Sequence, residues 1–185
     1  MISIKTKLKD ALIVEPDKSG DEREIFSPSA WCQHEFEILG MDKKPVQSNI
    51  SFNKKRGTLR GLYYQEHPFC EAKLVRCNMG AAYFVVIDLR PESETYLQWI
   101  SVELSEKNKR LFYVPEGLAH GFMTLRDNTE VFYQMSQYYM PEYARGIRWD
   151  DPLFGIKWPL KVSVISEKDS QYPYFAALPD RSLAF

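Results

Sequence analysis

The sequence predicts an all-β domain, either a sandwich or a barrel, with only a few short helices. Proline, glycine, asparagine and aspartate recur at short intervals along the 185 residues, so they divide the chain into many short elements. The apolar runs between these breaks are rich in valine, isoleucine and aromatic residues and are too short for most helices. The length is typical of one domain, which we expect to span residues 1–185.

The first clear element is a helix expected over residues 29–39. Ser29 suits the N-cap position, because its hydroxyl can accept a hydrogen bond from a free backbone N–H of the first turn. Trp31, Phe36 and Leu39 could form part of an apolar face. This segment is the best helix candidate in the chain.

Three strands are expected further along. Residues 81–89 form a near-continuous apolar run that predicts a buried strand. Residues 109–114 predict a second strand, which ends where Pro115, Glu116 and Gly117 break the pattern. Residues 130–139 mix aromatic and polar side chains, which is typical of a strand with one face on a cavity.

Composition excludes several classes of protein. The chain is 44% hydrophobic, enough for a substantial core, and its net charge of −1 gives no basic field for nucleic acid. No apolar run reaches the ~20 residues that span a bilayer. The first five residues lack the apolar stretch of a signal peptide, so we expect a cytoplasmic protein with no membrane partner.

Cysteine and histidine give little support for a metal. Cys32, Cys70 and Cys77 are odd in number and lack Cys-x-x-Cys spacing, which favours reduced, buried thiols. A zinc site of His67, Cys70 and Cys77 is a weaker alternative, because the spacing fits no common zinc finger. The only other histidines are His34 and His120, and no His-x-His pair offers the usual ligands of a jelly roll.

Four motifs in a fixed order carry a family resemblance. They are GTLRGLYYQ at residues 57–65, AKLVR at 72–76, VPEGLAHGF at 114–122 and ISEKD at 165–169. Together they resemble the sugar-nucleotide 3,5-epimerase family, enzymes that act on dTDP-4-keto-6-deoxyhexoses. The resemblance covers roughly residues 21–173. It implies a cupin-type jelly roll, usually a dimer with exchanged strands, that uses no metal or other cofactor.

The resemblance also implies a catalytic set. Its members are Tyr63, Lys73, His120, Tyr133 and Asp169. Epimerisation beside a ketone needs a base, a group that stabilises the enolate oxygen and an acid on the other face. By resemblance Lys73 stabilises the enolate, Tyr133 is the acid and Asp169 orients the base. His120 fits either a catalytic or a structural role in a close-packed wall.

One position in this set departs from the family. The family has a histidine as general base where this chain has Tyr63. A free tyrosine has a pKa of about 10, so only ~0.1% is phenolate at pH 7. A nearby cation such as Lys73 would favour the phenolate, whereas the negative charge of Asp169 would disfavour it. We therefore expect slow or altered proton exchange.

A second set is implied to bind the substrate, a dTDP- or CDP-linked sugar. Its members are Arg23, Gln47, Asn49, Arg60, Tyr139 and Lys168. In the family, the set that includes Arg23, Gln47 and Asn49 is supplied across the dimer. Arg60 and Lys168 are candidate diphosphate contacts, although a structural salt bridge would also suit Arg60. Tyr138 and Tyr139 offer aromatic surface for stacking or ordinary core packing, and Glu71 stands where glutamine is common.

The function that follows is an isomerase acting on a nucleotide-linked 4-keto-6-deoxysugar. It would epimerise carbon 3, carbon 5 or both through an enolate, with a base step altered by Tyr63. Two alternatives stay open. One is a binding homologue that kept the pocket but lost the base. The other is a cupin with different chemistry, such as ketoisomerisation.

Overall fold

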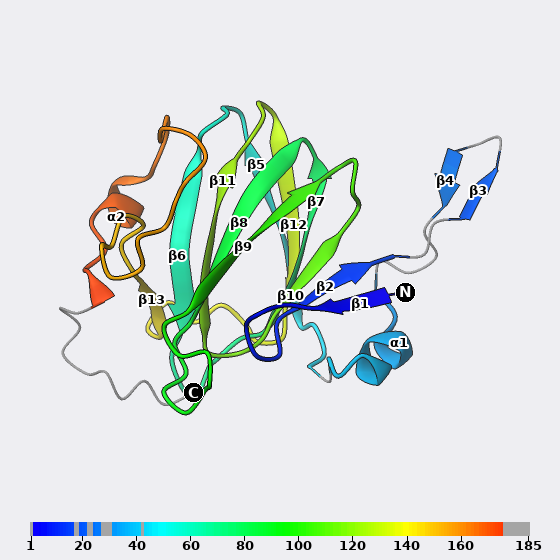
Figure 1. Ribbon diagram of the computed structural model, residues 1–185, viewed down its shortest axis with the longest axis horizontal. Coiled ribbons are helices and arrows are strands. Elements are labelled where there is room, and N and C mark those ends of the chain that lie inside the picture. Colours follow the sequence, from blue (N-terminus) through cyan, green and yellow to red (C-terminus); the bar gives the residue numbers. More distant parts are fainter. Residues whose placement is uncertain (1, 17–18, 22–23, 27–30, 42, 176–185) are drawn as a thin grey trace.

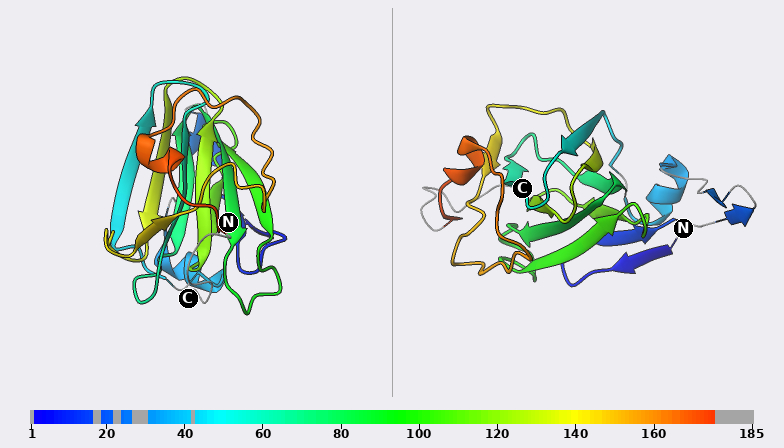
Figure 2. Two further views of the ribbon diagram at one scale, coloured as in Figure 1. Left: turned by 90° about the vertical axis from the view of Figure 1, so that its left-hand side faces the viewer. Right: turned by 90° about the horizontal axis from the view of Figure 1, so that it is seen from above.

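Two antiparallel sheets pack face to face and form the body of the molecule (Figures 1 and 2). The computed structural model describes residues 2–16, 19–21, 24–26, 31–41 and 43–175. Within these ranges the regular structure is almost entirely strand, with two short helices. The predicted all-β, cupin-type jelly roll is confirmed.

The larger sheet has six strands and the smaller one five. In spatial order the larger sheet contains β1 (Ile2–Lys5), β2 (Leu12–Glu15), β10 (Leu111–Val114), β7 (Lys73–Met79), β12 (Thr129–Met135) and β5 (Gln47–Asn53). The smaller sheet contains β13 (Ala144–Gly146), β6 (Leu59–Gln65), β11 (Leu118–Thr124), β8 (Ala81–Asp88) and β9 (Trp99–Ser105). A separate hairpin pairs β3 (Ser19–Asp21) with β4 (Glu24–Phe26).

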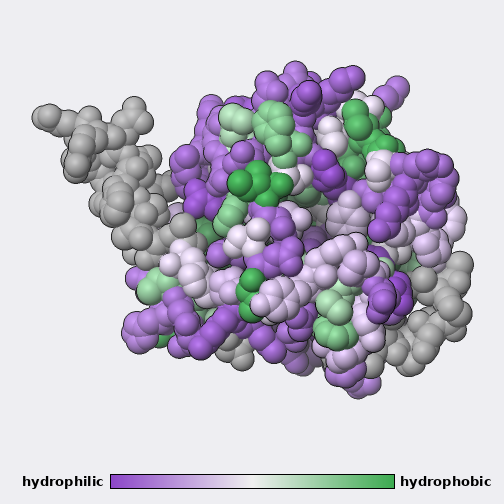
Figure 3. Space-filling model, turned by 180° about the vertical axis from the view of Figure 1, so that it is seen from behind, coloured by the Kyte–Doolittle hydropathy of each residue, from purple (hydrophilic) through white to green (hydrophobic). Residues whose placement is uncertain are grey.

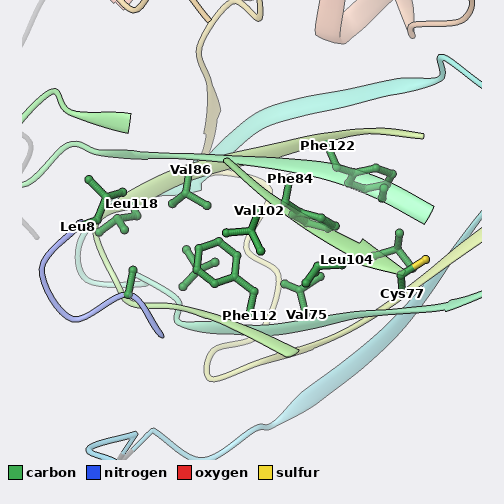
Figure 4. Packing of buried hydrophobic residues seen from close by; sticks show 14 residues of the cluster. Leu8, Val75, Cys77, Phe84, Val86, Val102, Leu104, Phe112, Leu118 and Phe122 are labelled. Atoms are coloured by element: carbon green, nitrogen blue, oxygen red, sulfur yellow. The ribbon is translucent and has the colours of Figure 1, made fainter. Parts of the chain in front are cut away.

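The main core lies between the two sheets (Figure 4). Phe84 and Val86 of β8 pack there with Val75 of β7 and Phe112 of β10. Because side chains alternate along a strand, the neighbouring residues of β8 point to the opposite face. The segment after β13 covers that face, where Phe154 is among the buried residues. Strand β8 is therefore buried on both sides, which explains its continuous apolar run.

The predicted strands are confirmed and the predicted helix is shorter than expected. Residues 81–89, 109–114 and 130–139 contain β8, β10 and the greater part of β12. Helix α1 spans Gln33–Ile38, and its N-cap is Cys32, which makes no side-chain capping bond. The backbone of Cys32 is extended, so the helix cannot start earlier there. The expected cap, Ser29, lies outside the described residues.

The apolar face of α1 is as predicted. Phe36 is fully buried against the outer face of the larger sheet, and Trp31 and Leu39 pack beside it. Seen from behind in Figure 3, the surface carries small apolar patches separated by polar side chains. Neither helix in the described ranges is long and apolar enough to cross a membrane.

An irregular pairing between β6 and β11 prepares the site. Tyr63 pairs with His120 and Arg60 pairs with Phe122, so β6 has one residue more than β11 between these pairs. In a regular strand, residues three apart point to opposite faces. The extra residue removes one alternation, as in a β-bulge. Arg60 and Tyr63 consequently both reach the same cavity.

Gly121 lies on β11 at the irregular pairing, opposite the extra residue of β6. We expect Gly121→Ala to destabilise the protein by about 1–3 kcal/mol. A methyl group there would lie 2.6 Å from the carbonyl oxygen of Arg60 and 2.8 Å from Cδ2 of Leu62. The backbone oxygen cannot move without disturbing the sheet. Urea denaturation measures the change.

A matched control is Gly155→Ala, because a methyl group at that position meets no atom within 4 Å. Its backbone φ is +56°, so this substitution costs only what a left-handed alanine costs, on the order of 1 kcal/mol. Equal stability of Gly121→Ala and the parent protein would show that the close approach of the strands is not a constraint.

Candidate active site

A cavity of about 430 Å³ opens between the two sheets near β5 and β6. It is lined by side chains from β5, β6, β7, β8, β11, β12, β13 and α2 (Glu167–Ser170). Among its lining residues are Gln47, Asn49, Arg60, Tyr63, Lys73, His120, Tyr133, Tyr139, Lys168 and Asp169. Every predicted site residue except Arg23 is thus placed at one cavity, and Arg23 lies outside the described residues.

Tyr63 is hydrogen-bonded to Asp169. Its hydroxyl donates to Oδ2 of Asp169 over 2.6 Å, and the backbone N–H of Gly61 approaches the same oxygen at 3.3 Å. Asp169 is held in the first turn of α2, where its N–H donates to Oγ of the N-cap residue Ser166. Helix α2 therefore fixes the carboxylate against the phenol.

The surroundings keep Tyr63 protonated. Burial, the hydrogen bond to Asp169 and the charge of Asp169 raise the pKa of Tyr63 far above that of a free tyrosine. The cation that opposes them is Arg60. The expectation that Lys73 plays this part is wrong: the Lys73 ammonium is held by Glu71 and His120 instead. At neutral pH, Tyr63 is a hydrogen-bond donor.

Lys73 is buried and points inward, as predicted. Its Nζ lies 2.7 Å from Oε1 of Glu71 and 2.8 Å from Nε2 of His120. It also lies 5.4 Å from the ring centroid of Tyr133. Burial lowers the pKa of Lys73, and the charge and hydrogen bond of Glu71 act against that shift.

His120 and Tyr133 lie beside the Lys73 ammonium, and both are neutral. Burial and the charge of Lys73 lower the pKa of His120 well below its usual value. A neutral His120 can accept a hydrogen bond from the ammonium through Nε2. Burial and the charge of Glu71 raise the pKa of Tyr133, so its phenol also stays protonated.

The outer part of the cavity is polar. Nε2 of Gln47 donates to Oδ1 of Asn49 over 3.2 Å, and Oε1 of Gln47 accepts from the N–H of Tyr139 over 3.0 Å. Tyr138 and Tyr139 are 60% and 50% exposed, so core packing, one of their two interpretations, is wrong. Lys168 is exposed and lines the cavity beside Asp169.

Arg60 carries a charge that no described carboxylate neutralises. Its Nε donates to Oδ1 of Asn53 over 2.7 Å, and it forms no ion pair within the described ranges. The structural salt bridge considered from the sequence is therefore not found there. The exposed guanidinium is available to an anionic ligand.

Tyr172 is a cavity residue that the sequence analysis missed. Its ring lies edge-on to Tyr63 with 6.3 Å between centroids, and burial and Asp169 raise its pKa to about 12. A methyl group on Gly146 would collide with this ring, which favours a glycine there. No local pattern marks Tyr172, because its contact with Gly146 joins the segment after α2 to β13.

The described thiols and histidines are not grouped as metal ligands. Cys70 and Cys77 are buried free thiols, as predicted, whereas Cys32 is only half-buried. In the described part of the chain, no three His, Cys, Asp or Glu side chains are grouped to hold a metal ion. The zinc alternative built on His67, Cys70 and Cys77 is therefore wrong.

Comparison with known proteins identifies the family. The family model described as dTDP-4-dehydrorhamnose 3,5-epimerase matches residues 5–177. The chain belongs to this family. A dTDP-4-dehydrorhamnose 3,5-epimerase from Sinorhizobium fredii is 42% identical over 176 residues, which cover 93% of this chain and 88% of that protein.

Solved structures of the family share the fold. The dTDP-4-dehydrorhamnose 3,5-epimerase of Bacillus anthracis, with TDP and PPi bound, matches with a TM-score of 0.90 and 38% identity, covering 94% of this chain and 98% of that one. The 3,5-epimerase of Legionella pneumophila, in complex with dTDP-4-keto-L-rhamnose, also has a TM-score of 0.90 and 38% identity. That match covers 98% of this chain and 96% of the other.

Proposed function

We propose that this protein is an isomerase acting on a pyrimidine-nucleotide-linked 4-keto-6-deoxysugar. It exchanges the proton at carbon 3, carbon 5 or both through an enolate, and Tyr63 slows the step that a histidine base performs in the family. The observation that carries this proposal is the placement of Tyr63 and Tyr133 on opposite sheets, with the Lys73 ammonium in the same cavity beside Tyr133.

Inversion at a carbon needs proton transfer on two faces of the sugar. Tyr63 lies on β6 of the smaller sheet and Tyr133 on β12 of the larger one, so a ring bound in the cavity has a phenol on each side. Proton removal beside the ketone moves the C–H electron pair into the carbonyl and leaves negative charge on its oxygen. Lys73 is suited to stabilise that oxygen.

The difficult step is the removal of the first proton. Forming a phenolate at pH 7 costs ~4 kcal/mol for a free tyrosine, and the raised pKa of Tyr63 increases that cost. Tyr63 can bind a substrate oxygen as a neutral hydrogen-bond donor, whereas donating its proton to an enolate carbon would form the same costly phenolate. We therefore expect slow exchange rather than efficient double epimerisation.

The two solved structures named above hold TDP and a dTDP-sugar, which supports a nucleotide-diphosphate sugar as ligand here. We expect the dimer typical of the resembled family, with each cavity completed by the Arg23 region of the second subunit. The oligomeric state is measurable by light scattering, and a monodisperse monomer would exclude that arrangement. The absence of a metal, of any other cofactor and of nucleic acid, and the cytoplasmic location, also stay predictions.

Arg60→Ala is expected to weaken the binding of dTDP roughly tenfold or more. Charge-assisted hydrogen bonds contribute about 1.5–3 kcal/mol each, and Arg60 has no described carboxylate to occupy it. Isothermal titration calorimetry measures the affinity. Arg126→Ala is the control, because Arg126 is exposed and pairs with Glu106 away from the cavity lining. Equal affinity of the parent and Arg60→Ala would exclude a diphosphate contact at Arg60.

The proposed function is tested by incubating the protein with dTDP- and CDP-linked 4-ketosugars in heavy water. We expect slow deuterium incorporation beside the ketone, followed by NMR. Tight binding without any exchange would instead establish the binding homologue, which the Tyr63–Asp169 hydrogen bond favours. Movement of the carbonyl to another carbon would establish a ketoisomerase.

A further inference from the structure

We propose that Glu71 is a positioning residue for Lys73: its buried carboxylate holds the ammonium in the protonated form and fixes it against the cavity wall. The inference rests on the proposed function, because it assigns Lys73 to the enolate oxygen. Glu71 stands where the resembled family commonly has glutamine, so the charge is a feature of this chain.

The backbone aims both side chains into the cavity. Residues two apart in an extended chain point to the same face, and Glu71 and Lys73 both line the cavity. Between them, Ala72 is held on both sides: its N–H donates to Oγ of Ser136, and its carbonyl accepts from the N–H of Ser136. The pair is therefore presented by a fixed segment.

The contacts of Lys73 fix its orientation. An ammonium has three N–H donors. One is directed to Oε1 of Glu71 over 2.7 Å, and Nε2 of His120 lies 2.8 Å away as an acceptor for a second. One donor is left for a ligand oxygen beside Tyr133. Without Glu71, the ammonium would lose its only charged partner among the described residues.

Glu71 is more than nine-tenths buried, with 8% of its surface exposed. Its Oε2 is buried and has no hydrogen-bond partner among the described residues. A carboxylate is costly to bury in this way, so it persists only with a strong compensating contact. Among the residues that the structure describes, Lys73 is the one cation in contact with it.

The electrostatic balance at Lys73 depends on this carboxylate. The ionisable groups that face its Nζ are Glu71 ahead of β7, His120 on β11 and Tyr133 on β12, and Arg60 lines the same cavity from β6. His120 and Tyr133 are neutral, and Arg60 is positive. Burial lowers the pKa of Lys73, and Glu71 is the group that raises it.

Glu71→Gln tests the proposal directly, because the amide keeps the shape and removes the charge. The intact protein is prepared with ¹³C-labelled lysine, and the Lys73 signal is assigned by its loss in Lys73→Arg. We expect Lys73 to be protonated at pH 7 in the parent and its titration midpoint to move to lower pH in Glu71→Gln. Glu71→Asp, which retains the charge, should restore most of the parent behaviour.

The control is Glu130→Gln, which removes a partly exposed carboxylate from the far end of β12. Glu130 lies five residues from Met135, the residue paired with Lys73, which is roughly 17 Å along the strand. We expect no change in the Lys73 titration. An unchanged midpoint of the Lys73 titration in Glu71→Gln would overturn the proposal. If that variant does not fold, a neutral Lys73 in the parent at pH 7 would overturn it instead.

The NMR measurement is independent of turnover. If the parent exchanges no ketosugar proton but Glu71→Gln shifts the Lys73 titration, the proposed function fails while the role of Glu71 stands. If the parent exchanges protons and the titration does not move, the role of Glu71 fails alone. If the parent is active, we expect its exchange rate to fall at high pH, and we expect that fall to begin at a lower pH in Glu71→Gln.

Discussion

Tyr63→His is expected to raise the rate of deuterium incorporation beside the ketone of a 4-ketosugar by about 10²–10⁴-fold at pH 7. This is the usual contribution of a positioned general acid or base. An imidazole has a pKa near neutrality, so a large fraction is ready to accept a proton. The measurement compares parent and variant on the same ketosugar in heavy water by NMR.

The gain follows from the sign of the interaction with Asp169. A carboxylate disfavours a phenolate, because ionisation of Tyr63 creates a second negative charge 2.6 Å from the first. The same carboxylate favours an imidazolium, because proton uptake by a histidine creates the opposite charge. Helix α2 therefore supplies a partner suited to a histidine base and unsuited to a tyrosine base.

Tyr63→Phe separates the hydroxyl from the ring. It keeps the edge-on contact with Tyr172 and removes the donor to Asp169. We expect its exchange to be no faster than that of the parent, so an increase confined to the histidine variant identifies the base. Full-speed exchange at two carbons by the parent, abolished in Tyr63→His, would show that tyrosine is a competent base here.

The sequence predicted the strands because the burial of each strand is reflected in its own pattern of apolar and polar residues. The apolar run before Leu89 reflects a strand covered on both faces, and the mixed pattern around Tyr133 reflects a face on the cavity. The start of α1 was not predictable in this way. It depends on the extended backbone at Cys32 and not on a capping side chain.

The site was predicted through ordered motifs, and so was the contact of Asp169 with the side chain at position 63. The contacts of Lys73 with Glu71 and His120 were not predicted, because they join β7 and the segment before it to β11. The irregular pairing near Gly121 determines which residues of β6 face inward. The contact of Tyr172 with Gly146 joins distant segments, so the sequence around Tyr172 carries no signal of it.

Lys73→Met is expected to destabilise the protein by about 3–5 kcal/mol at pH 7. The methionine retains much of the hydrocarbon length, so the main loss is the charge at 2.7 Å from Glu71. The Glu71 side chain is only 5% exposed and Oε2 already lacks a partner, so the variant leaves a buried carboxylate uncompensated. Chemical denaturation measures the loss, which should shrink at acid pH as the stranded carboxylate takes up a proton.

The double variant Lys73→Met with Glu71→Gln decides whether the loss comes from the stranded charge. Removing both charges leaves an amide in place of a carboxylate, so we expect the double variant to be more stable than Lys73→Met alone. We expect the double variant to remain slow in proton exchange even though its stability recovers, because loss of a group that stabilises an oxyanion costs about 10²–10³-fold in rate. Simple addition of the two single effects on stability would mean that the Glu71–Lys73 pair contributes no coupling. In that case the packing of the Lys73 hydrocarbon chain, and not its charge, would account for its contribution to stability.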